Sequence, residues 1–181
     1  MLDEMLVALA EVLREADVAG DNVYVGQPDP DVVTADSTGV FLQLLNGPRL
    51  HQGSARDIIL GDTTNVDGTI DTTYSQALYE ATVAVDVFAP PPGDGGTELL
   101  YGLLDDVVGA LDGAFVGDTT SAEAVGGIAV VLEDGEELEG EPLDCCKYRL
   151  LLNTVFHYLR YETIWPAETI DIESTDEEGW D

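Results

Sequence analysis

The stretch SQALYEATVAVDVFA, residues 75–89, decides the fold of this chain. The odd positions from Ala77 to Val87 fall on one face of an extended strand, and the even positions from Leu78 to Phe88 fall on the other. This alternation lasts 15 residues, whereas strands in globular proteins usually have about 3–10. We therefore predict a strand whose outer end projects beyond the core as an arm or hairpin.

A second long segment has the same character. Residues 147–163, KYRLLLNTVFHYLRYET, alternate with period two and are rich in aromatic and β-branched side chains, which favour strands. Two long strands of matching length can stabilise each other through cross-strand side-chain pairs. We expect this segment to pair with residues 75–89.

The rest of the chain supplies helices and shorter strands. Residues 1–18 and 97–111 have apolar positions at helical spacing, and Thr97 is expected to cap the second helix. Shorter strands are predicted at 22–26, 39–45, 54–60 and 126–132, and an acidic loop at 133–144. This order predicts an α+β fold in which two helices pack on a mixed or antiparallel sheet of about four to six strands. Residues 1–165 form one domain in this interpretation, and residues 166–181 form an acidic C-terminal tail.

The charge of the chain is extreme. There are 37 Asp and Glu against 6 Lys and Arg, a net charge of −31 on 181 residues, while a small domain usually carries a magnitude of about 2–8. Such self-repulsion opposes the compact state at ordinary ionic strength. At about 1 M salt the Debye length falls to roughly 3 Å and the repulsion is screened. Since the acids are spread along the whole chain, we predict a protein of a halophilic archaeon rather than an acidic interaction tail.

The same composition excludes some functions. Nucleic-acid affinity comes largely from Lys and Arg at phosphates, and six scattered cations cannot form a basic stripe, so we expect no sequence-specific nucleic-acid binding. The sequence has no apolar run of the ~20 residues that a membrane span needs. The two cysteines are adjacent, which disfavours a disulfide between them and fits assembly in a reducing cytoplasm.

No catalytic constellation is visible, so we expect no catalytic residues and no cofactor. His51 and His157 have no nucleophile motif beside them and are interpreted as a turn residue and a sheet residue. The polar stretch 61–73 contains Asp67-Gly68, a hairpin signal. Asn65, Asp67 and Asp71 match positions of a calcium loop, but Thr63 and Tyr74 replace the first Asp and the bidentate Glu. A plain hairpin is favoured, and a loose cation site at these three residues is the alternative.

The order of elements resembles the tail terminator family of long-tailed viruses. The resemblance is carried by MLDEMLVALAEVL at 1–13, VYVGQP at 23–28, ALYEATVAVDVFA at 77–89, TELLYGLLDDVVGAL at 97–111 and YRLLLNTVFHYLRYE at 148–162. It covers most of the chain as an order of elements and includes no invariant motif.

The resemblance implies a structural virion protein, here of a haloarchaeal tailed virus, assembled in the host cytoplasm. Family members form hexameric rings that cap the tail tube, stop its elongation and join it to the head connector, and DNA later passes through the lumen. The partners implied are further copies of the chain, a tail tube protein and a head connector or completion protein. The open alternatives are another head–tail joining protein, a halophilic cytosolic binding domain and, last, an enzyme.

The outer end of the long strand is where we expect neighbouring subunits to meet. The residues predicted to lie at this subunit interface are Asp67, Gly68, Tyr74, Tyr79, Arg160 and Tyr161.

Overall fold

The computed structural model describes residues 2–26, 38–51, 58–116, 125–138 and 146–165. The predicted acidic tail at 166–181 lies outside the described residues. The helices are α1 (Leu2–Glu15) and α2 (Gly96–Leu111), with a short 3-10 turn at Pro92–Asp94. The strands are β1 (Val23–Val25), β2 (Gly39–Leu50), β3 (Ile58–Thr64), β4 (Ile70–Ala89), β5 (Phe115–Val116), β6 (Val125–Glu137) and β7 (Cys146–Ile164).

All the strands belong to one mixed sheet. Its order is β1-β2-β4-β7-β6-β5, with β3 also paired to β4, which makes seven strands. Only β1 runs parallel to its neighbour β2, and the other pairs are antiparallel. The α+β class predicted from sequence is therefore correct, but the expected four to six strands were too few. The predicted pairing of the two long segments is confirmed, since β4 and β7 pair from Ala89↔Cys146 to Ile70↔Ile164.

Several expected boundaries were wrong for identifiable reasons. β2 continues through Asn46-Gly47-Pro48, which reads as a turn, because pairing with β4 resumes after two register shifts. β6 runs into the acidic loop as far as Glu137, since its pairing with β7 continues there. β3 lies nearer the hairpin than expected, and residues 54–57 of the predicted strand lie outside the described residues.

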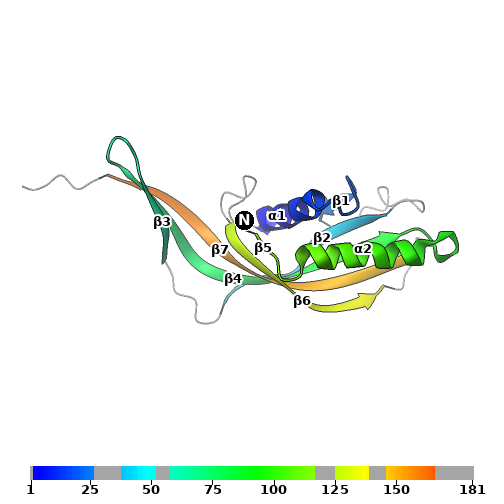
Figure 1. The fold of residues 1–181 in the computed structure, drawn as a ribbon. Coiled ribbons are helices and arrows are strands. Elements are labelled where there is room, and N and C mark those ends of the chain that lie inside the picture. Colours follow the sequence, from blue (N-terminus) through cyan, green and yellow to red (C-terminus); the bar gives the residue numbers. More distant parts are fainter. Residues whose placement is uncertain (1, 27–37, 52–57, 117–124, 139–145, 166–181) are drawn as a thin grey trace, which may run out of the picture.

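Both helices pack on one face of the sheet (Figure 1). The main core lies between the two helices and the sheet, and it is one cluster of apolar side chains. The helices α1 and α2 line one side of it. β4 contributes the odd positions from Ala81 to Ala89, and β7 contributes Leu150, Leu152 and Phe156. The buried Thr154 hydroxyl donates to the Ala81 carbonyl at 2.9 Å and contacts the Met5 sulfur at 3.4 Å. This polar group therefore has its partners inside the core, as buried hydroxyls need.

The turn from β4 into α2 depends on a glycine. A Cβ atom at Gly96 would lie 1.6 Å from the Pro90 carbonyl oxygen, so no other residue fits there without moving the backbone. The helix begins at Gly96, and the residue before it, Gly95, is left-handed with φ +78 and provides no side-chain cap. The expected cap at Thr97 was therefore wrong, because close packing against the proline turn fixes where this helix starts.

The core position of Phe156 gives a stability prediction. This side chain is 0% exposed, whereas Phe115 is 71% exposed. Replacing a buried Phe with Ala leaves a cavity and costs about 3–5 kcal/mol. Phe156→Ala should lower the free energy of unfolding by about that amount in denaturant titrations at about 3 M salt. Phe115→Ala is the control and should change it by less than about 0.5 kcal/mol. Equal losses in the two variants would contradict the placement of the core.

Candidate assembly interface

The outer ends of β4 and β7 extend past the rest of the sheet as a three-stranded arm. β2 pairs with β4 only as far as Leu50↔Tyr79, and β6 pairs with β7 only as far as Val125↔Tyr158. Beyond this level the described sheet consists of β3, Ile70–Ser75 of β4 and Leu159–Ile164 of β7. We call these three segments, with the turn at 65–69, the arm. Figure 1 shows it curling away at one end, while both helices cover the other end.

A β-bulge separates the arm from the core region. Ser75 pairs with Leu159 and Ala77 pairs with Tyr158, so Gln76 is one extra residue on β4. A bulge of this kind bends the strand and increases its local twist. The extra residue Gln76 therefore accounts for the bend in β4, and the bend directs the arm away from the helix-covered core.

The arm carries much of the exposed apolar surface of the described chain. It holds six of the thirteen exposed large hydrophobic side chains if Trp165, next to the end of β7, is included. They are Ile59, Leu60, Val66, Tyr161, Ile164 and Trp165. Large exposed apolar patches on soluble proteins mark sites of contact with other molecules. Since neither helix reaches the arm, this surface fits contact with another polypeptide.

The predicted interface residues do not all lie in the arm. Tyr74 and Arg160 are cross-strand partners, and the Arg160 guanidinium carbon lies 5.1 Å from the centre of the Tyr74 ring. Tyr161 is opposite Thr73 on the exposed end of β7. Tyr79 instead packs against the core, with its ring 6.2 Å from that of Phe156. Tyr74 and Tyr79 stand at an even and an odd position, and the extra residue Gln76 between them brings both onto the same face of the sheet.

The tip of the arm is a tight turn between β3 and β4. Asn65 accepts a backbone hydrogen bond from Gly68, whose φ of +83 suits glycine, and donates one to the Thr69 carbonyl. Asp67 accepts hydrogen bonds from the Thr69 amide at 3.0 Å and the Thr69 hydroxyl at 2.6 Å. The hairpin that Asp67-Gly68 predicts is thus present, and both residues lie at its end.

The three residues of the alternative cation site form hydrogen bonds with other residues of the arm. The Asn65 amide donates to Asp71 at 2.9 Å and to the Thr69 hydroxyl at 3.0 Å, and the Thr163 hydroxyl donates to Asp71 at 2.6 Å. The hydrogen bonds from Thr69 lower the pKa of Asp67, and those from Thr163 and Asn65 lower the pKa of Asp71. Within the described residues, no three His, Cys, Asp or Glu side chains are grouped to hold a metal ion.

The two histidines lie on either side of β4, since His51 follows β2 and His157 belongs to β7, and both strands pair with β4. His51 Nδ1 lies 2.9 Å from Glu80 Oε2, and this bond, with the neighbouring Arg49, lowers the pKa of Glu80. His157 Nδ1 lies 2.8 Å from the Ser75 hydroxyl, and burial lowers the pKa of His157. Sequence analysis missed this serine because it is 82 residues away. Ser75 is only 1% exposed, and the pair joins β4 to β7 at the base of the arm.

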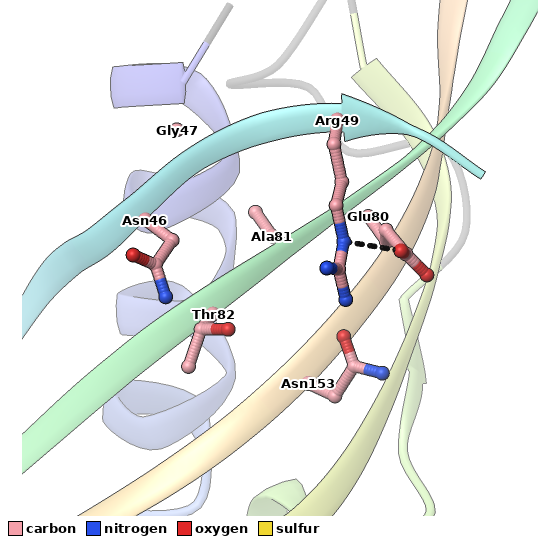
Figure 2. A pocket seen from close by; sticks show the side chains of 7 residues that line it. All are labelled: Asn46, Gly47, Arg49, Glu80, Ala81, Thr82 and Asn153. Carbon is pink, nitrogen blue, oxygen red and sulfur yellow. Dashed lines mark ion pairs between the residues drawn. The ribbon is translucent and has the colours of Figure 1, made fainter.

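A polar hollow of about 440 Å³ lies on the helix-free face of the sheet (Figure 2). Its lining consists of Asn46, Gly47, Arg49, Glu80, Ala81, Thr82 and Asn153. The Glu80 carboxylate is held by the Arg49 guanidinium, as the dashed line in Figure 2 marks. The remaining polar groups are neutral amides and a hydroxyl. The hollow therefore offers neutral hydrogen-bonding groups beside the ion pair of Arg49 and Glu80.

The comparisons with known proteins leave the function open. No family model matches this sequence, and no curated protein matches it. Among solved structures, the chain is similar to a chain from the virion of a native gene transfer agent particle, with 15% sequence identity and a TM-score of 0.46. The similarity covers 84% of this chain and 94% of that chain. At this identity and TM-score it does not decide what this chain does.

The turn geometry predicts how Asp67 and Asp71 titrate. Both pKa values are lowered from an ordinary value of 3.8, so the carboxylates support the turn fully above that value and lose this effect as the pH falls below it. In a carbon-13 titration, Thr69→Val should raise the pKa of Asp67 toward its ordinary value. Thr163→Val should raise the pKa of Asp71 with a much smaller effect on Asp67, so each variant is the control for the other. Unchanged midpoints in both would contradict this turn geometry.

Proposed function

We propose that this protein is a structural subunit of the virion of a haloarchaeal tailed virus, and that it is the tail terminator. In this role copies of the chain form a ring, here a hexamer, on the end of the tail tube. The observation that carries the proposal is the arm, a three-stranded extension with exposed apolar side chains and no helix over it. A surface of this kind fits a subunit that completes its packing against a neighbour.

A ring with rotational symmetry suits a protein that joins the tail tube to a head connector. In a cyclic ring each subunit contacts the next through two different surfaces, so the two faces of the ring also differ. One face can then bind the tail tube protein, and the other can bind a head connector or completion protein. A projecting arm provides a surface on one side of the subunit that can reach the next copy.

The electrostatics agree with a channel that DNA crosses. The chain carries a net charge of −31, and negative walls repel phosphate groups. DNA would pass such a lumen without sticking, and no cofactor or catalytic group is required. None of the helices in the described part of the chain is both long and apolar enough to span a membrane. The host cytoplasm as the place of assembly, and the virion as the final location, belong to the same proposal.

The first test is microscopy of the purified protein. At about 3 M salt, where the charge repulsion is screened, negative-stain images should show rings with six-fold symmetry. Added to growing tail tubes, the rings should stop elongation and appear at one end of each tube. Rings that never bind tube ends would favour another head–tail joining protein of the same virus. A monomer at all concentrations would favour a cytosolic binding domain and contradict the proposal.

The second test shortens the arm. Replacing Asp62–Thr72 with Asn-Gly should close the hairpin with a two-residue turn between the paired residues Gly61 and Thr73. The helix-covered core is untouched, so the midpoint of thermal unfolding should change little, whereas ring formation should be lost. Sedimentation velocity in about 3 M salt measures the assembly. Rings that form as readily as those of the unmodified chain would show that the arm is not the contact.

A further inference from the structure

The edges of the sheet differ in how well they are protected from pairing with another chain. An unprotected edge strand offers free amide and carbonyl groups to any strand that reaches it, and proteins blunt such edges with short strands, charges, proline or bulges. The outermost strands β1 and β5 have three and two residues. Both are too short to template a neighbouring strand.

The longer edges next to them are blunted by their sequences. The part of β2 beyond its pairing with β1 contains Gly47-Pro48, and proline has no amide to donate. The part of β6 beyond its pairing with β5 contains Glu133, Asp134, Glu136 and Glu137. The outer end of β7 carries Arg160 and Glu162, whose side chains form an ion pair at 3.2 Å.

β3 is the exception among the described strands. It has seven residues, IILGDTT, with no proline, no cation and a single acid. In the described chain it pairs only with β4. Ile59 is 55% exposed and Leu60 is 47% exposed. Its one irregularity, the bulge between Ile59 and Gly61, leaves an apolar side chain exposed rather than a charge. An exposed apolar edge strand is a site of association.

We propose that the outer edge of β3 is the edge to which a second copy of this chain adds a strand. The inference rests on the proposed ring, and it names the contact that joins its subunits. Main-chain hydrogen bonds and apolar burial persist in concentrated salt, whereas attraction between exposed charges is screened. β3 also belongs to the arm, the part of the fold that projects away from the helix-covered core (Figure 1).

A ring excludes one strand of the neighbour, its own β3, as the partner of this edge. Two β3 edges that paired with each other would form a two-fold contact, which uses the same patch on both copies and ends in a dimer. A ring needs a contact between two different patches. The second copy therefore provides a strand other than its own β3, so that its β3 stays available for the next copy.

The test is a charge placed on this edge. Ile59→Lys should raise the subunit concentration at which half of the rings dissociate by about tenfold or more, since it removes apolar burial and adds a charge to the contact. Val131→Lys is the matched control, because Val131 is 56% exposed on β6. It should leave assembly unchanged. Both variants should keep the unfolding midpoint of the parent chain, which separates lost assembly from lost folding.

A cysteine cross-link tests the head-to-tail arrangement. Thr63→Cys is introduced with Cys145 and Cys146 both changed to Ser, and the protein is oxidised under conditions in which rings form. Little cross-linked dimer is expected, and a strong dimer band would overturn this arrangement by showing that two β3 edges meet.

Rings of Ile59→Lys that are as stable as the parent rings would overturn the β3 contact and leave the ring intact. A parent chain that forms no rings would overturn the proposed function itself.

Discussion

The pairing of β4 with β7 is the constraint on which the rest of the structure depends. The two strands pair over nineteen residue positions, which is about 60 Å at ~3.3 Å per residue. The helices have 14 and 16 residues, or about 21 and 24 Å at 1.5 Å per residue. Each helix is therefore shorter than half of this paired length. The uncovered arm is therefore a geometric consequence of strands that are too long for the helices of the same chain.

Acidic side chains lie on both faces of the sheet. α1 carries four acids and Arg14, and α2 carries three acids and no cation. On the helix-free face, the Asp86 carboxylate accepts hydrogen bonds from Arg149 at 2.6 and 2.8 Å and from Gln43 at 2.9 Å, and it raises the pKa of Arg149. Partly buried pairs are screened less than exposed ones. The helices thus contribute seven acids and one cation, while Asp86 on the other face is held in a partly buried ion pair.

The sequence predicts the two long strands and their pairing, but it does not predict the register of that pairing. Period-two alternation identifies residues 75–89 and 147–163, but a register needs more than alternation. The one extra residue at Gln76 shifts every partner beyond it, and no local signal marks this bulge. Alternation alone therefore places Tyr74 and Tyr79 on opposite faces, whereas the bulge brings both onto the same face. Residues 47–48 and 133–137 have the local sequence preferences of loops. They are extended because β2 pairs with β4 and β6 pairs with β7 at these positions, and the local sequence does not reveal that pairing.

The polar groups of the core region find their partners within the fold. Thr154 bonds to the Ala81 carbonyl, Ser75 bonds to His157, and Asp86 bonds to Arg149 and Gln43. Each of these contacts joins two strands of the sheet. Here the groups are satisfied within the fold, and the arm is where the described chain gathers apolar side chains that its own fold does not cover. That arrangement fits a building block whose packing is completed by a neighbour.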